Sequence, residues 1–181
     1  MQKRSHRLLA QALLQGRSGF SAKRYEAAFL FGSFQPDCNP LSYLKGSFRA
    51  HALQGHHYEN SHRYLYSRIT RLQQRKRWTI WQYYTLGKLT HYLADAFTYP
   101  HNDNYPDTLA QHHRYESDLR LCLARELPAA LPAPEPEKGD LVSALKALHQ
   151  SYVSAASDLS RDVAYILLAN ALLMAGCTPA M

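Results

Sequence analysis

A chain of 181 residues is long enough for one domain with a substantial core, so disulfides or outside support are not needed for stability. Its three cysteines, Cys38, Cys122 and Cys177, are far apart and lack CxxC spacing, which argues against a disulfide framework or a thiolate zinc finger and predicts free thiols in a reducing compartment. The net charge of +7 favours partners that carry phosphate groups.

The pattern of apolar residues predicts helices and no sheet. We expect helices at 5–15, 22–32, 58–75, 77–97, 107–126, 140–155 and 159–175. Ser21, Asp107 and Asp140 are expected to cap the second, fifth and sixth of these, because each offers a side-chain oxygen to free backbone N–H groups. The predicted fold class is therefore all-α, a single compact multi-helix domain over residues 1–181.

Neither end of the sequence predicts a membrane-spanning segment. The basic start MQKRSH precedes an apolar run that Gln11 and Gln15 interrupt, and we expect an amphipathic helix there rather than a secretion signal. The longest apolar run, VAYILLANALLMAG (163–176), is shorter than the roughly 20 residues that span a bilayer and predicts a buried core helix. We therefore expect a cytoplasmic protein.

Two stretches interrupt the helical pattern. Residues 31–61 contain Gly, Pro and Asn at intervals typical of an irregular loop, which would let their polar side chains turn inward without helical periodicity. Residues 127–139, LPAALPAPEPEKG, form a proline-rich connector. We expect this connector to join the last two helices to the rest of one packed unit, with a mobile linker as the alternative.

Five potential metal ligands fall within one predicted helix, one turn and the start of the next helix. His91 and Asp95 are four residues apart and share a helix face, as do His112 and Glu116. Pro100 is expected to end the first helix, which leaves His101 on the turn between the pairs. Imidazole and carboxylate ligands without a thiolate suit catalytic zinc better than structural zinc. The sequence therefore predicts a multinuclear zinc cluster between the helices.

These residues resemble the signature of the zinc-dependent phospholipase C family, an all-helical fold that holds a cluster of zinc ions. HYLADAFTYPHN (91–102) followed by HHRYE (112–116) is similar to the family's central motif, and KRSH (3–6), GSFQPD (32–37) and GHHYENS (55–61) are similar to its other ligand segments. The resemblance implies two or three zinc ions per chain. The first would bind Asp37, His56, His91 and Asp95, the second would bind His101, His112 and Glu116, and the third would bind His6 with the far side of Asp95.

Three neighbouring histidines leave the choice of one ligand open. His56 directly follows Gly55 within the family-like segment, which favours it over His51, His57 and His62, but a loop gives no periodicity to decide. The choice of His112 over His113 is clearer, because only His112 lies four residues before Glu116. His149 stands alone on a late helix and is expected to be an ordinary surface or core histidine.

The resemblance implies a hydrolase that cleaves phosphodiester bonds, most naturally those of a phospholipid or a related phosphate ester. Zinc neutralises the anionic ester and lowers the pKa of bound water toward 7. Asp37 is the expected base or water-orienting group. Two alternatives stay open: a single-strand-specific zinc nuclease, which shares this helical architecture, and a non-catalytic metal-binding or interaction protein that keeps the cluster for folding.

The densest basic stretch is HRYLYSRITRLQQRKRW, residues 62–78. Such a run is most often a solvated helix face. The alternative is attraction to phospholipid headgroups or nucleic acid, since clustered cations strengthen binding to phosphates. The nearby Tyr and Trp residues suit a lipid interface or base stacking equally, so the sequence alone does not choose between these partners.

Overall fold

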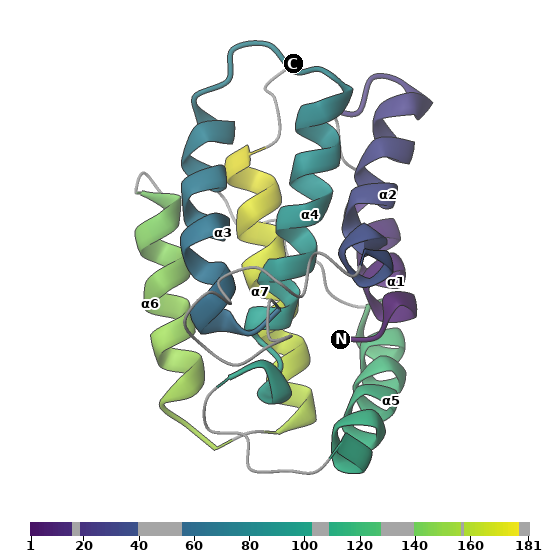
Figure 1. The fold of residues 1–181 in the computed structure, drawn as a ribbon, viewed down its shortest axis with the longest axis vertical. Coiled ribbons are helices and arrows are strands. Elements are labelled where there is room, and N and C mark those ends of the chain that lie inside the picture. Colours follow the sequence, from purple (N-terminus) through teal and green to yellow (C-terminus); the bar gives the residue numbers. More distant parts are fainter. Residues whose placement is uncertain (16–18, 40–55, 103–108, 128–139, 157, 178–181) are drawn as a thin grey trace.

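The computed structural model describes residues 1–15, 19–39, 56–102, 109–127, 140–156 and 158–177 (Figure 1). These residues form seven α-helices and one short 3-10 helix, with no strand among them. The elements are α1 (Lys3–Leu14), α2 (Lys23–Cys38), α3 (Tyr58–Gln73), α4 (Ile80–Ala96), η2 (Tyr99–His101), α5 (Leu109–Glu126), α6 (Leu141–Val153) and α7 (Leu159–Cys177). The prediction of a single all-α domain is confirmed.

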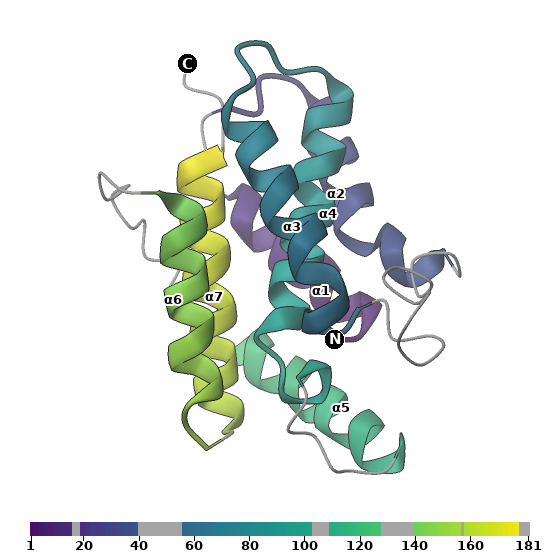
Figure 2. The same ribbon diagram turned by 60° about the vertical axis from the view of Figure 1, so that its left-hand side comes forward.

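Helices α4 and α7 form the centre of the bundle. α4 packs against α1, α2, α3 and α7, and α7 packs against α3, α5 and α6 (Figures 1 and 2). The last eight residues of α4, from Leu89 to Ala96, are all buried, which fits a helix surrounded by others. The metal-ligand candidates His91 and Asp95 therefore project from the most protected element of the fold.

Helix α7 is the predicted core helix. By length and composition it is long and apolar enough to cross a bilayer, and among the described residues it is the one helix that passes this test. Half of its most apolar stretch is buried inside the bundle, as in the core helices of many water-soluble proteins. The absence of a transmembrane segment stays a prediction.

One of the three N-caps predicted from the sequence is confirmed. Asp140 Oδ1 accepts a hydrogen bond from Val142 N at 3.1 Å, as predicted. The prediction for Ser21 is wrong: Ala22 is the N-cap of α2, and no side chain caps that helix. Asp107 lies outside the described residues. α4 has a cap that we did not predict, a capping box of Thr79 and Gln82.

The expected irregular loop at 31–61 is wrong at its start, whereas the helix expected from residue 58 is confirmed. α2 continues through Pro36 to Cys38, and α3 begins at Tyr58. Pro36 lies in the last turn of α2, where its missing N–H removes little of the helix, and its side chain is buried. Asp37 is therefore held on a helix instead of a turn. Residues 40–55, the remainder of the expected loop, lie outside the described residues.

The last two helices belong to the same packed unit as the rest. α7 contacts α3, α4 and α5, so the part that follows the proline-rich connector is joined directly to the bundle. Most of the connector, residues 128–139, lies outside the described residues. Cys38, Cys122 and Cys177 are all free thiols, in agreement with the prediction.

Candidate metal centre

Two glycines bring α2 and α4 into close contact. A Cβ atom on Gly32 would overlap the backbone of Tyr84, and a Cβ atom on Gly87 would overlap the backbone of Phe29, so only hydrogen fits at either position. Gly87 contacts Phe29, and His91, four residues later on α4, contacts the carbonyl oxygen of Ser33, four residues later on α2. The helices run parallel, and their C-terminal ends carry Asp37 and Asp95 to the same level.

The first group of ligand candidates converges on one point from three segments of the chain. His91 Nε2 lies 3.2 Å from Asp95 Oδ2 and 3.6 Å from Asp37 Oδ1. His56 Nδ1 lies 3.2 Å from Asp95 Oδ2, 3.8 Å from Asp37 Oδ1 and 3.1 Å from His91 Nε2. His56 stands just before α3, so the group joins α2, α4 and the start of α3.

These separations fit a four-coordinate zinc ion. Zinc–nitrogen and zinc–oxygen bonds of about 2.0–2.1 Å in a tetrahedron place neighbouring ligand atoms about 3.3 Å apart. The five separations in the first group that involve a histidine nitrogen run from 3.1 Å to 3.8 Å. Two histidine nitrogens and two carboxylate oxygens are also a ligand set that zinc accepts. The four atoms therefore match zinc in both chemistry and spacing.

A backbone contact fixes which nitrogen of His91 faces the group. His91 Nδ1 lies 3.0 Å from the carbonyl oxygen of Ser33, which can only accept a hydrogen bond. Nδ1 therefore carries the proton, and Nε2 keeps a free lone pair directed at Asp37 and Asp95. A histidine held in this way by a backbone carbonyl is oriented for a metal before the metal binds.

His6 of α1 approaches the first group from the opposite side of Asp95. Its ring stacks on His91 with centroids 3.8 Å apart, and its Nε2 lies 3.2 Å from Asp95 Oδ1. Both ring nitrogens are buried without a directed hydrogen bond. Burial and the nearby His91 lower the pKa of His6 to about 4, so the ring is neutral at pH 7 and has a lone pair for a cation. Asp95 thus presents one oxygen to each of two ligand groups.

The second group consists of His101, His112 and Glu116, whose ligand atoms all lie within 4.8 Å of one another. His112 Nε2 lies 3.2 Å from Glu116 Oε1 along α5. Burial disfavours ionisation of Glu116, but the hydrogen bond from His112 and the positive charges around it lower its pKa to about 2. Glu116 is therefore a carboxylate over the whole physiological pH range, ready to bind a cation.

Thr98 fixes the tautomer of His101. The Thr98 hydroxyl donates its single hydrogen to the Asp95 carbonyl oxygen at 2.7 Å, so it can only accept from His101 Nδ1, also at 2.7 Å. His101 Nδ1 is consequently protonated and Nε2 is the free nitrogen. Burial and the amino group of Met1 hold the pKa of His101 well below its usual value, which keeps this ring neutral.

The amino group of Met1 lies between the two groups. Its nitrogen is 2.6 Å from Asp95 Oδ1 and 3.4 Å from Glu116 Oε1, where α1, α4 and α5 approach one another (Figure 1). Burial alone would lower the pKa of this amine, but Asp95, Glu116 and Asp37 together raise it above its usual value. A positive charge is thus stabilised at this point, which shows how strongly the buried carboxylates favour a cation.

The structure brings all eight predicted ligands into these adjoining groups. His56 is buried in the cluster, whereas His57 is half-exposed and His62 Nδ1 contacts the carbonyl oxygen of Tyr58. His51 lies outside the described residues. His113 is exposed, and His149 is a core histidine that stacks on Tyr58, as predicted for a residue without a metal role.

The supporting contacts from Ser33 and Thr98 were not predicted. Ser33 acts through its backbone, which carries no sequence signal. Thr98 lies three residues before His101, a spacing that suits a hydrogen bond within one turn, and this was the one available clue.

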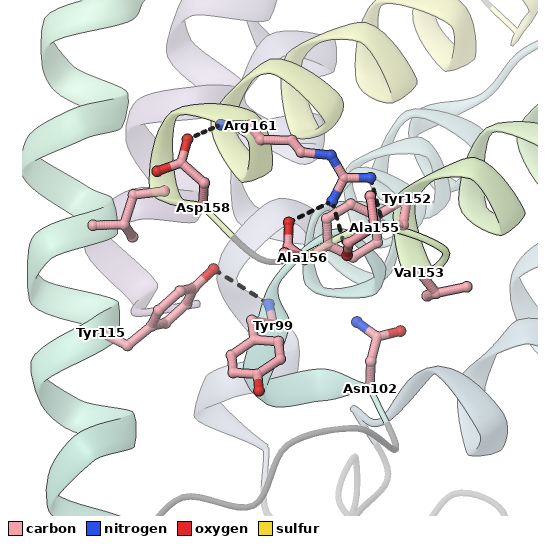
Figure 3. A pocket seen from close by; sticks show the side chains of 10 residues that line it. Tyr99, Asn102, Tyr115, Tyr152, Val153, Ala155, Ala156, Asp158 and Arg161 are labelled. Atoms are coloured by element: carbon pink, nitrogen blue, oxygen red, sulfur yellow. Dashed lines mark hydrogen bonds between the residues drawn. The ribbon is translucent and has the colours of Figure 1, made fainter.

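A cavity of about 690 Å³ lies beside η2, lined by Tyr99, Tyr115 and Tyr152 among others (Figure 3). Arg161 reaches across it and donates to the carbonyl oxygens of Ser151, Tyr152, Ala155 and Ala156. These carbonyls lie at and just beyond the end of α6, so Arg161 satisfies groups that the helix leaves without partners. Its guanidinium therefore serves the fold.

The family model of zinc-dependent phospholipase C matches residues 5–159. The chain belongs to the zinc-dependent phospholipase C family. The matched span contains the seven residues of the two ligand groups as well as His6, and it confirms the resemblance predicted from the sequence motifs. Comparison with curated proteins gives no match, and comparison with solved structures gives none either. Membership of the zinc-dependent phospholipase C family supports zinc as the cofactor and a phospholipid as the substrate of a zinc-dependent hydrolase.

Proposed function

We propose that the protein hydrolyses a phosphodiester bond of a phospholipid or a related phosphate ester, using two or three zinc ions held by the eight side chains described above. The observation that carries this proposal is the first group, in which four ligand atoms from three segments converge at separations that match tetrahedral zinc. A buried cluster of this kind is costly to assemble for stability alone, because its carboxylates repel one another without a cation.

Bound zinc would neutralise the phosphodiester and lower the pKa of water toward 7, so that a nucleophile forms at neutral pH. Contacts within the chain orient the histidines that would bind this zinc. Ser33 and Thr98 hold His91 and His101 with their Nε2 lone pairs free, and the neutral state of His6 keeps a further nitrogen available.

We assign to Asp37 the role of accepting the proton of the attacking water. The side chain of Asp37 is 14% exposed, whereas the side chain of Asp95 is fully buried. Asp37 Oδ1 faces His56 and His91, while Asp37 Oδ2 is buried 4.0 Å from His6 Nε2 and has no hydrogen-bond partner among the described residues. One oxygen can thus bind the cation while the other orients the attacking water and accepts its proton.

Substitution of Asp37 by Asn tests this role. The amide keeps the size of the side chain and one oxygen ligand but removes most of its basicity, so hydrolysis of a water-soluble aryl phosphodiester should fall roughly 10²–10⁴-fold. Zinc content and melting temperature should change little. Asp118→Asn, at an exposed position on α5, is the matched control and should keep full activity. Full activity in Asp37→Asn would contradict the role of Asp37.

The choice of substrate is tested separately with phospholipid vesicles, single-stranded DNA and RNA as competing substrates of the zinc-loaded protein. If the protein hydrolyses only nucleic acid, its function is that of a nuclease and not of a phospholipase. The absence of any turnover would favour the non-catalytic metal-binding protein. A cytoplasmic location remains our expectation, and the three free thiols support a reducing compartment.

A further inference from the structure

One face of α4 runs from an exposed tryptophan to the metal ligands. Trp81, Tyr84, Lys88, His91 and Asp95 follow one another at alternating spacings of three and four residues, so they form a single stripe along the helix. Trp81 is 68% exposed, whereas His91 and Asp95 are fully buried. The stripe thus connects the surface at the start of α4 to the metal centre.

The exposed end of this stripe is apolar and aromatic. Phe31 of α2 stacks on Tyr84 with ring centroids 5.9 Å apart, and Trp81 meets the same ring edge-on at 6.1 Å. Phe31 is 52% exposed and Ile80 is 45% exposed. Trp81, Phe31 and Ile80 are three of the six exposed large apolar side chains among the described residues. Ile80 and Trp81 begin α4, and Phe31 lies midway along α2.

Cationic side chains lie between the rings of this surface. Lys88 Nζ lies 5.6 Å from the ring centre of Tyr84 and 5.7 Å from that of Tyr64 on α3. The guanidinium of Arg68 also lies 5.6 Å from the ring centre of Tyr64. Aromatic rings and cations therefore alternate across α2, α4 and α3, an arrangement in which both kinds of group stay partly accessible.

The turn between α3 and α4 adds three further cations. Arg75, Lys76 and Arg77 are all exposed, and none of them forms an ion pair within the described part of the chain. Two residues separate Arg77 from Ile80, and the turn lies at the end of the bundle away from α5 (Figures 1 and 2). Three free positive charges thus lie beside an exposed apolar patch.

We propose that this surface, formed by Phe31, Ile80, Trp81 and the cations Arg75, Lys76 and Arg77, docks on an anionic phospholipid membrane. Tryptophan is enriched at the boundary between headgroups and acyl chains, where an apolar ring and its N–H are both satisfied. The three cations would lie against lipid phosphates, whose negative surface attracts basic segments. The α4 stripe would then lead from the docked end toward the metal centre.

A membrane fits this surface better than single-stranded nucleic acid. Nucleic acid is held by a groove that follows its backbone and by rings on which bases stack. Here the most exposed ring has an exposed isoleucine, Ile80, directly beside it, which adds apolar area but no stacking face. The inference rests on the proposed function only in its choice of phospholipid as the partner, because docking itself requires no hydrolysis.

Tryptophan fluorescence tests the docking directly. The chain has two tryptophans, and Trp78→Phe leaves Trp81 as the sole reporter. Vesicles of phosphatidylcholine mixed with phosphatidylserine should shift the Trp81 emission to the blue and protect it from acrylamide, whereas phosphatidylcholine alone should do so much less. An unchanged Trp81 spectrum with anionic vesicles would overturn the proposal.

Vesicle sedimentation compares the membrane binding of variants with that of the wild type. Trp81→Ala and Arg77→Glu should each weaken binding to anionic vesicles roughly tenfold. Leu121→Ala, which removes a 60% exposed side chain from α5, and Lys146→Glu on α6 are the matched controls and should bind like the wild type. Equal binding by Trp81→Ala and the wild type would contradict the proposal, as would tighter binding to single-stranded DNA through Trp81 and Arg77.

Hydrolysis of the soluble aryl phosphodiester separates docking from catalysis. Trp81→Ala should keep wild-type activity on this substrate, because Trp81 lies outside the ligand groups, while its activity on anionic vesicles falls with its binding. If the wild type hydrolyses neither substrate, the proposed function fails, and the fluorescence and sedimentation results still decide the docking. Equal loss of activity by Trp81→Ala on both substrates would contradict a docking role.

Discussion

Gly87 of α4 packs directly against the backbone of Phe29 on α2, so closely that a Cβ atom at position 87 would overlap the Phe29 carbonyl oxygen. Ser33 and Asp37 follow Phe29 at intervals of four residues, and His91 and Asp95 follow Gly87 at the same intervals. The close approach of the two helices therefore determines how near Asp37 lies to His91, and the first ligand group depends on it.

Gly87→Ala should force α2 and α4 apart. We expect the free energy of unfolding of the metal-free protein to fall by about 2–3 kcal/mol, because backbone atoms cannot move aside as a side chain can. Zinc affinity should fall as well, since Asp37 moves away from His91. Gly176→Ala is the control: its Cβ atom would meet only the flexible side chain of Leu141, and we expect a change within about 1 kcal/mol. Denaturant titrations and zinc titrations measure both effects, and equal losses in the two variants would contradict a special role for Gly87.

Thr98→Val should weaken zinc binding at the second group without unfolding the protein. The variant keeps the shape of the side chain but removes the oxygen that holds His101 Nδ1–H, and loss of such a supporting contact costs about 10–100-fold in metal affinity. Thr90→Val is the matched control, because the buried Thr90 hydroxyl donates to a helix carbonyl, that of Leu86, but contacts no ligand candidate. Competition with a zinc chelator measures the affinity. Identical affinities in the two variants would show that Thr98 does not orient His101.

His112→Ala should lose zinc from the second group, whereas His113→Ala should lose little. His112 Nε2 lies 3.2 Å from Glu116 Oε1, while His113 is exposed on another side of α5. Zinc per chain after dialysis against a weak chelator provides the measurement. The same loss in both variants would mean that α5 presents a different face to the metal.

The spacing of four residues was sufficient to predict that His91 pairs with Asp95 and that His112 pairs with Glu116, because both residues of each pair lie on one helix. The stacking of His6 on His91 joins α1 to α4, and no periodicity within a single helix reports such a contact. The prediction that residues of different helices bind the same zinc ion came from the family motifs.

The structure at Asp37 could not be predicted from local signals. Pro36 and the neighbouring glycine and asparagine indicated a loop, but packing of Phe29, Gly32 and Ser33 on α4 continues the helix through Pro36. The gain from these contacts outweighs the single hydrogen bond that proline removes. The spacing of Thr79 and Gln82 did carry a capping-box signal. With Thr79 as its cap, α4 starts at Ile80, three residues after the expected start of the helix at residue 77.

The stability of the metal-free protein should fall as the pH is lowered through the range in which buried His149 titrates. Burial, with a contribution from His62, lowers the pKa of His149 to about 4, whereas the unfolded chain titrates near 6.5. The unfolded state therefore binds more protons between these values, so the free energy of unfolding decreases from pH 6.5 to pH 4, by at most about 3 kcal/mol.

His149→Gln should show a smaller decrease over this pH range than the wild type. The described residues include no carboxylate that pairs with His149, whose contacts include Asn102 and the rings of Tyr58 and Phe97. His113→Gln, at an exposed position, should keep the wild-type pH dependence. Urea titrations in the presence of chelator, at pH values from 4 to 7.5, measure the difference. A steeper pH dependence in His149→Gln would have the wrong sign for a buried neutral histidine.

Elemental analysis of the purified protein, never exposed to a chelator or a nickel resin, tests the zinc cluster most directly. The two ligand groups and His6 should hold two or three zinc ions per chain, and His91→Ala, which removes a ligand of the first group, should lose at least one of them. Removal of the zinc should also lower the melting temperature, because Asp37, Asp95 and Glu116 then lack their counter-charge. Less than one zinc ion per chain in the wild type, or an unchanged zinc content in His91→Ala, would contradict a zinc-dependent phosphodiesterase built on this cluster.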